Sequence, residues 1–524
     1  MSSGSSLAPA DFDASDAGVE TVNHAELPDI SRVAPNSLKS LLLPDPVTAA
    51  VVTVITVLTY LPTLLATYGI SDDYFDLLLS TRDNRSLPNV AIAGGRPVSG
   101  LLQEFTLSLA TDVGSLRWLR LLGVLGIAAT AVVGSAIIRS LGAGKAVQVL
   151  TGLGIAAMPS SQVIASWAVL FPVSWGTALA LAAGFSLRAL RVESFRQREW
   201  WLAAGLVAVV TTIGLANYQP SAMAFAPGFV LALIDSAESL TLRARRAAAG
   251  IVGAVGGGLA YLVLSSILVK WTGVTVDTRS SLELPGADKL NWFVVEVVPR
   301  SLDPISFQPR TVVAVVVAVL VLIGLASTAR TWSDRLIVVA LATSAVFFAY
   351  LPTLMVIDQW PSARSRLSID ITVSLFFGVA VHAAIVKARP YPILQRSILV
   401  SWGAIIALFT VFASWRVTAY YVNPQVTEYA VVSKAIADLH LQPGATVVVI
   451  AADWQLPLAP DVDLDEFGFP SMATSWGPVA LIQLEMMHDG FAPLTDITVV
   501  TDVSQVPSTA QIVLDIRVLF DTLR

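Results

Sequence analysis

Long apolar runs separated by short polar segments dominate the chain from residue 46 to residue 415. Each run is about 18–24 residues long, the length of helix that crosses about 30 Å of hydrocarbon. The runs lie at 46–68, 118–138, 144–164, 166–187, 200–218, 220–238, 248–269, 311–329, 336–357, 367–386 and 397–415. The pattern predicts an all-α polytopic membrane protein with about eleven membrane-spanning helices. It also requires Met158–Ser161 to turn the chain between two spans with almost no loop.

Clusters of arginine and lysine indicate the orientation. All of them fall on one side if the spans alternate, and short cytoplasmic loops are enriched in these residues. The clusters are Arg139 and Lys145; Arg188, Arg191, Arg196 and Arg198; Arg243, Arg245 and Arg246; Arg330 and Arg335; Lys387, Arg389 and Arg396. We therefore expect a multi-pass protein of the plasma (inner) membrane with a cytoplasmic N-terminus and an extracytoplasmic C-terminus.

The two ends of the chain differ from the middle. Residues 1–45 begin polar and acidic, whereas a secretory signal peptide begins basic and continues apolar, so we expect a disordered cytoplasmic tail. After the transmembrane domain, residues 46–418, the character changes at 419–524. A helical stretch at 424–440 follows Asn423–Pro424, and three β-branched runs come after it: Thr446–Ile450, Ile497–Thr501 and Gln511–Ile516. This pattern predicts a small extracytoplasmic α/β domain.

Composition excludes several classes of protein. Only 13% of the residues are charged, about half the usual share of a soluble domain, and 55% are hydrophobic. The net charge of −6 argues against a nucleic-acid-binding protein with a broad basic face. The absence of cysteine excludes disulfides, zinc–thiolate sites and thiol nucleophiles.

Two adjacent carboxylates follow the first span, at the start of the outer loop 69–117, which we expect to be catalytic. Asp72 and Asp73 lie at the exit of a membrane span, where a charge is costly unless it is hydrated, paired with another charge or part of a functional site. Either could act as a general base toward a hydroxyl or as a metal ligand, and the alternative is a helix capped by Ser71 or Asp72. Asp72, Asp73 and Asp76 could ligate Mg²⁺ or Ca²⁺, but three acids so close in sequence are not a complete metal site.

Two further motifs suit anion or sugar binding. Gly95 allows close backbone approach to a ligand, and Arg96 offers a planar fork for phosphate or carboxylate, unless the motif is a turn with a solvated arginine. Tyr218 and Gln219 end the fifth span with groups that can bond a sugar or a headgroup. Their alternative is an aromatic-belt tyrosine followed by a turn.

A late outer segment, 358–366, carries two arginines against the positive-inside bias. Arg364 and Arg366 either pair with outer carboxylates or hold a lipid phosphate. The candidate substrate-binding residues overall are Tyr74, Gly95, Tyr218, Gln219 and Trp360.

Two other segments carry weaker signals. In the outer loop 270–310, Leu290, Phe293, Val294 and Val297 share a helical face, which predicts an amphipathic interfacial helix over a lipid groove, or else plain loop packing. Trp454, Phe467, Phe469 and Trp476 either bind an acceptor glycan or pack against the strands.

In their order along the chain, these motifs resemble the Gtr-type (phage-type O-antigen) glucosyltransferases, a family of GT-C membrane glycosyltransferases. The resemblance covers about residues 46–415 and rests on Asp72–Asp73, Gly95–Arg96, Tyr218–Gln219 and Arg364 or Arg366. Pro97 departs from the family's aromatic residue. The C-terminal α/β domain suggests a related branch with its own acceptor.

The resemblance implies an inverting transfer of one sugar from a polyprenyl-phosphate donor to a cell-envelope glycan or glycolipid acceptor outside the cytoplasm. Asp72 would be the base, with Asp73 orienting the acceptor or Asp72, or the two acids would exchange these roles. Arg96, Arg364 and Arg366 would bind the donor phosphate. No cofactor is implied beyond a divalent cation, and no nucleic acid. The alternatives are a lipid-linked sugar transporter or flippase, and a polymerase or ligase of envelope glycans.

Overall fold

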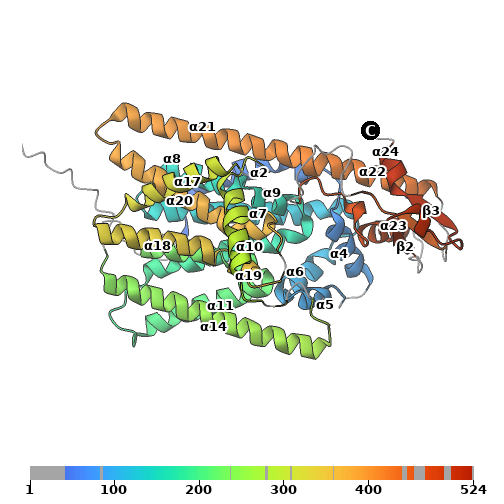
Figure 1. Cartoon of the computed structure of the whole chain (residues 1–524), viewed down its shortest axis with the longest axis horizontal. Helices are drawn as coiled ribbons and strands as arrows, with labels where there is room; N and C mark the ends of the chain where they lie inside the picture. The colour runs from blue at the N-terminus through green and yellow to red at the C-terminus, as the bar shows by residue number, and fades with distance from the viewer. Residues whose placement is uncertain are drawn as a thin grey trace, which may run out of the picture.

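The computed structural model describes residues 42–82, 86–235, 238–277, 281, 283–306, 310–357, 359–439, 445–453, 466–488 and 497–521. They form an elongated bundle of helices with a small α/β unit at one end (Figure 1). The expected tail at 1–45 lies outside the described residues as far as residue 41.

Each expected apolar run contains helix. The helices are α2 (Pro46–Thr59) with α3 (Leu61–Leu65), α7 (Leu116–Ser140), α8 (Lys145–Ala157) with α9 (Pro159–Ser166), α10 (Phe171–Ser186), α11 (Arg198–Asn217), α12 (Gln219–Ala222) with α13 (Phe225–Leu233), α14 (Leu240–Thr272), α17 (Thr311–Ala326), α18 (Trp332–Phe348) with α19 (Leu351–Leu354), α20 (Leu367–Lys387) and α21 (Pro392–Val417). In the described part of the chain, six helices are long and apolar enough to cross a membrane, or seven if the bent pair α8–α9 is one span. The polytopic helical class is confirmed, but the count of eleven spans is not.

The chain does not reverse at Met158–Ser161, as the sequence suggested. It bends there by 60° and continues as α9, because Pro159 starts a new helix, where its missing N–H costs no hydrogen bond. The reversal comes at Trp167 and the 3₁₀ turn Ala168–Leu170, before α10.

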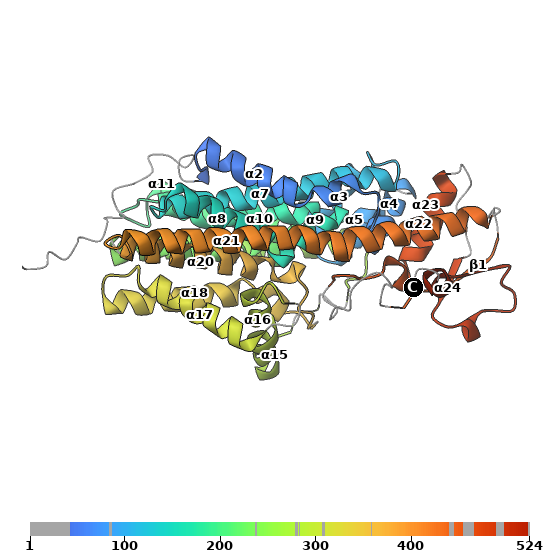
Figure 2. The same cartoon turned by 90° about the horizontal axis from the view of Figure 1, so that it is seen from above.

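One end of the bundle carries the candidate site and is called the site end. Here lie α4 (Ser71–Arg82), α5 (Ser86–Ala93) and α6 (Pro97–Leu107), close to the α/β unit in both views (Figures 1 and 2). At the opposite end, ion pairs join the arginine-rich loops. They are Arg188–Asp235, Arg243–Asp334 and Arg246–Glu238. Which end faces the cytoplasm stays a prediction.

The segment expected to be an amphipathic helix comprises α15 (Ala287–Trp292), a π turn (Phe293–Val297) and α16 (Val298–Leu302). Phe293 and Val297 are buried against the bundle, but Val294 is 61% exposed. The four apolar residues are thus divided between packing against the bundle and exposure, and the interfacial helix stays a prediction.

The C-terminal unit is α/β, as predicted. Its strands β1 (Val447–Ile450), β2 (Ile497–Val500) and β3 (Ile512–Asp515) form a parallel sheet in the order β2-β1-β3. Central β1 is buried along its whole length, as expected for an apolar strand with a neighbour on each side. Helices α23 (Gly477–His488) and α24 (Ile516–Asp521) complete the unit.

The helix before this sheet does not begin at Asn423–Pro424. Helix α21 runs through a π turn (Thr418–Val422) into α22 (Asn423–Asp438), which makes one helical segment of 47 residues. Pro424 lacks an N–H, and the preceding turn widens to accommodate it instead of ending the helix.

Candidate active site

Asp73 is an anchor at the start of α4. Its Oδ2 accepts hydrogen bonds from the N–H groups of Ile70 (3.0 Å) and Ala168 (3.3 Å), and its Oδ1 accepts one from Val169 (2.9 Å). The side chain is fully buried, and burial raises its pKa to about 6 although these hydrogen bonds and Arg120 lower it. Asp73 therefore ties the exit of the first helix to the reversal at 168–170, and both its oxygens are occupied.

Arg120 fixes the chain just before this point. It donates to the carbonyls of Thr63, Ala66 and Tyr68 at 2.8–3.0 Å, and its guanidinium lies 4.0 Å from the centre of the Tyr68 ring. Sequence reasoning missed Arg120. The available signal was a basic residue inside the expected span 118–138, where a charge needs a partner.

Asp72 has a different environment from its neighbour. It is half-buried, and its Oδ1 accepts a hydrogen bond from the indole Nε1–H of Trp476 at 3.1 Å. Among the described residues, no other hydrogen bond engages this carboxylate. Of the two predicted acids, Asp72 is thus the one with an oxygen left for a substrate.

The Gly95–Arg96 motif forms a latched turn. Gly95 has φ +71°, and its carbonyl accepts hydrogen bonds from Gln219 Nε2 and from the Tyr261 hydroxyl, each at 2.9 Å. A Cβ atom on Gly95 would lie 2.8 Å from the Tyr261 hydroxyl. The close approach that glycine permits is therefore to other parts of the chain. Gln219 is used to hold the turn, and Tyr261, on α14, was not foreseen.

This turn directs Arg96 toward Tyr218. The Arg96 guanidinium carbon lies 4.8 Å from the centre of the Tyr218 ring, and the Arg364 guanidinium carbon lies 4.8 Å from that of Trp167. Arg364 and Arg96 both lie within electrostatic range of the Tyr218 hydroxyl. The structure thus brings together two arginines from loops that are far apart in sequence.

Arg364 has an acidic partner from the C-terminal unit. Its Nε lies 2.7 Å from Glu466 Oε1, and its backbone N–H donates to Oε2 at 3.3 Å. Glu466 has φ 62°, a left-handed conformation that costs an L residue about 1–2 kcal/mol. Arg364 is also within electrostatic range of Asp72. Asp72, Arg96, Tyr218, Arg364 and Glu466 form what we call the site cluster.

Three predicted residues are engaged elsewhere. Arg366 is 3% exposed, donates to the carbonyl of Pro361 and lies beside Asp370, a fully buried acid in an expected span. Tyr74 is 1% exposed, and its hydroxyl accepts the N–H of Gly69. The Trp360 side chain is 52% exposed. The structure thus shows Arg366 and Tyr74 bonded to backbone groups and the Trp360 side chain exposed.

The three aspartates do not converge as metal ligands. Asp76 is buried, and burial and the nearby Asp72 and Asp73 raise its pKa well above its usual range. In the part of the chain that the structure describes, no group of three His, Cys, Asp or Glu side chains could hold a metal ion.

The C-terminal aromatic residues divide between packing and the site. Phe467 is buried and packs against Tyr421, with ring centres 5.1 Å apart, which is the packing alternative. Trp476 reaches Asp72. Trp454 lies outside the described residues.

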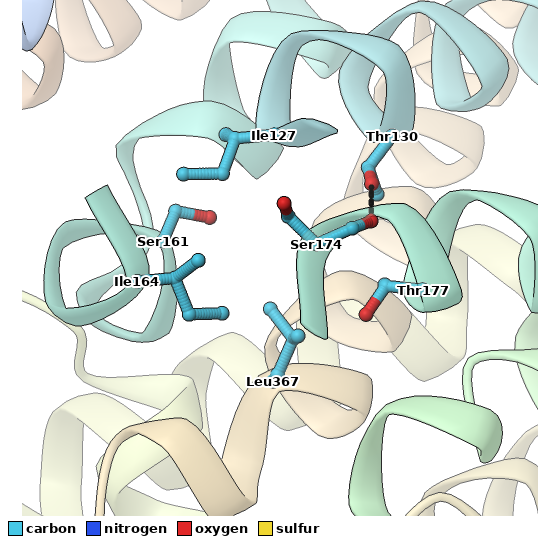
Figure 3. A pocket seen from close by; sticks show the side chains of 7 residues that line it. All are labelled: Ile127, Thr130, Ser161, Ile164, Ser174, Thr177 and Leu367. Atoms are coloured by element: carbon cyan, nitrogen blue, oxygen red, sulfur yellow. Dashed lines mark hydrogen bonds between the residues drawn. The ribbon is translucent and has the colours of Figure 1, made fainter. Parts of the chain in front are cut away.

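A separate small cavity lies inside the bundle, between α7, α9, α10 and α20 (Figure 3). It leaves about 10 Å³ for the centre of a water molecule, which is room for about one water. Its lining is Ile127, Thr130, Ser161, Ile164, Ser174, Thr177 and Leu367. It holds no residue of the site cluster and is too small for a sugar.

Comparison with known proteins gives a weak structural likeness. No protein family and no curated protein matches the sequence. Among solved structures, the chain is similar to the archaeal oligosaccharyltransferase AglB from Archaeoglobus fulgidus, in complex with an inhibitory peptide and a dolichol-phosphate. The identity is 11% and the TM-score 0.43, over 78% of this chain and 62% of that one, so the chain spans less than two thirds of that protein's length. A likeness of this size establishes no function.

Proposed function

We propose that the chain is an inverting membrane glycosyltransferase of the GT-C type. It would move one sugar from a polyprenyl-phosphate donor to a hydroxyl of a cell-envelope glycan or lipid on the extracytoplasmic face. One observation carries the proposal. At the site end, Asp72 is a half-buried carboxylate with one oxygen held by Trp476, and the two arginines lie near it, Arg96 over the Tyr218 ring at 4.8 Å and Arg364 within electrostatic range of Asp72.

The proposed step is a single displacement. The acceptor oxygen forms a bond to the anomeric carbon while the bond from that carbon to the phosphate oxygen breaks. The bonding electron pair leaves with the phosphate, and the acceptor proton passes to Asp72. Because attack and departure occur on opposite faces of the sugar, the configuration inverts.

The cluster has the charges that this step requires. The departing lipid phosphate carries a growing negative charge, and Arg96 and Arg364 are cations that can stabilise it. A phosphate leaves without being protonated first, so one carboxylate base is sufficient. A glycosidase, by contrast, needs a pair of carboxyl groups on the two sides of the bond.

The rival proposals are a transporter and a polymerase or ligase. Transporters place their binding groups near the middle of the membrane. The site cluster instead lies at one end of the bundle, next to the α/β unit (Figure 1). A polymerase or ligase with a diphosphate-linked donor would use the same charges, and donor preference separates it from a single-sugar transferase.

The test is sugar transfer in membranes containing the full chain, with radiolabelled polyprenyl-phosphate and polyprenyl-diphosphate sugars, with and without a chelator. Asp72→Asn should abolish transfer. Asp288→Asn, which changes an exposed acid on α15, should retain it. Near-normal turnover by the Asp72 variant would remove this residue from the mechanism, and movement of the lipid-linked sugar across the membrane without transfer would favour the transporter.

A further inference from the structure

A turn of the C-terminal unit docks on the start of α4. Residues 471–477, called the docking turn, contact α4 first through the Ser471 hydroxyl, which accepts the N–H of Ser71 at 3.0 Å. Two residues of α22 hold the turn from behind. Glu428 accepts the N–H groups of Ser471 (3.0 Å) and Met472 (2.9 Å), and Gln425 accepts the Ser471 hydroxyl proton at 2.7 Å.

These contacts are buried and fix the turn closely. Glu428 and Gln425 are each 1% exposed. At the other end of the turn, the Gly477 N–H donates to the Thr474 hydroxyl at 2.9 Å, and a Cβ atom on Gly477 would lie 2.2 Å from the Ser471 carbonyl oxygen. The position of Trp476, just before α23, is thus set by the turn around it.

From this position the Trp476 indole reaches Asp72. Its Nε1–H donates to Asp72 Oδ1 at 3.1 Å, from a residue 404 positions later in the chain. Trp476 is 39% exposed, so the contact lies at the edge of the site and not in a closed core. Helix α23 packs alongside α4, which keeps the two residues in register (Figure 1).

We propose that Trp476 is a positioning residue for the catalytic base, so that the C-terminal unit is a required part of the active site. The inference rests on the proposed function. The indole N–H holds Oδ1 of Asp72 and directs Oδ2 toward the acceptor hydroxyl. Because a side-chain carboxylate rotates freely when exposed, this single hydrogen bond selects the orientation in which the proton is taken.

The role predicts a specific kinetic effect. Trp476→Phe keeps an aromatic ring but removes the N–H, so it should lower kcat. A hydrogen bond to a charged group supports an expected loss of about tenfold to about a hundredfold. Donor binding depends on Arg96 and Arg364, so the donor KM and the binding of a non-transferable polyprenyl-phosphate analogue should not change. The matched control is Trp271→Phe, since Trp271 is 82% exposed at the end of α14.

The measurement is kcat and donor KM of the full-length variants in membranes, together with titration of the analogue. Analogue binding reports that Trp476→Phe is folded, and Trp476→Ala provides a second test of the same loss. If Trp476→Phe keeps kcat within about twofold of wild type while Asp72→Asn is inactive, the positioning role is refuted and the transferase proposal stands. If the wild-type protein transfers no sugar from any donor, the proposed function fails first.

Discussion

Replacing Gly95 with alanine tests how the arginine-bearing turn is built. Gly95 has φ +71°, and this region costs an L residue about 1–2 kcal/mol. A Cβ atom would also stand 2.8 Å from the Tyr261 hydroxyl and 3.0 Å from Gln219 Nε2, the two donors to the Gly95 carbonyl. Losing those two hydrogen bonds adds about 0.5–1.5 kcal/mol each. Gly95→Ala should therefore lower the free energy of unfolding by roughly 2–5 kcal/mol.

The change should also reach the proposed chemistry. Arg96 follows directly, and its guanidinium lies over Tyr218 only while the turn is held. We expect the donor KM to rise in Gly95→Ala, because a displaced Arg96 no longer meets the phosphate. The assays are unfolding in detergent followed by tryptophan fluorescence, and transfer at varied donor concentration.

The matched control lies on the helix that carries Tyr261. Gly258 is three residues before Tyr261 on α14, and a Cβ atom there would meet nothing within 4 Å. Gly258→Ala should be neutral or stabilising by about 1 kcal/mol, since alanine favours a helix more than glycine does. If Gly95→Ala unfolds like wild type and keeps its donor KM, the latched turn does not position Arg96 and the reasoning is refuted.

Two further predictions concern buried charge. Glu466→Gln should lower the donor KM by roughly tenfold, because the Glu466 carboxylate is paired with Arg364 and competes with the donor phosphate for it. A rise in the donor KM would contradict this competition, and so would the same decrease in an Arg364→Ala background. Burial raises the pKa of Asp73 from 3.8 in the unfolded chain to about 6 in the folded protein. Between these two pH values the folded protein binds the proton and the unfolded chain does not, so the free energy of unfolding falls by about 3 kcal/mol as pH rises from about 4 to about 6. Asp73→Asn should remove this part of the pH dependence, seen as a changing difference in melting temperature between variant and wild type, and a constant difference would be evidence against it.

Much of the fold followed from the sequence because membrane spans and buried strands leave strong local patterns. Each apolar run of the length of a span contained helix, and β-branched runs located all three strands to within a residue or so. Helix continuity was harder to foresee. Pro159 suggested a reversal and Pro424 a helix start, but a bend and a π turn accommodated them, because neighbouring packing decides how a proline is absorbed.

The candidate site could be predicted from the sequence only in part, because its residues are brought together by long-range contacts. Asp72 was identified because a charge is costly at a membrane exit, Arg96 because it offers a planar fork after a glycine, and Arg364 because it runs against the positive-inside bias. Their partners, Trp476 and Glu466, come from a different unit, and long-range contacts leave no local pattern in the sequence. The pair of acids also looked equivalent in the sequence. Only the three N–H groups around Asp73 distinguish an anchor from an available base.

The unbroken path from α21 into α22 limits how substrates can enter. An ordinary linker would let the α/β unit swing aside, but here about 24 Å of helix beyond the π turn acts as a stiff stalk rooted in the membrane. Bending of that stalk would carry Trp476 and Glu466 away from the site, and its weakest place is Thr418–Val422, where the regular hydrogen-bond spacing is already broken. Entry of a donor into the site would then require the last membrane helix to bend at this turn.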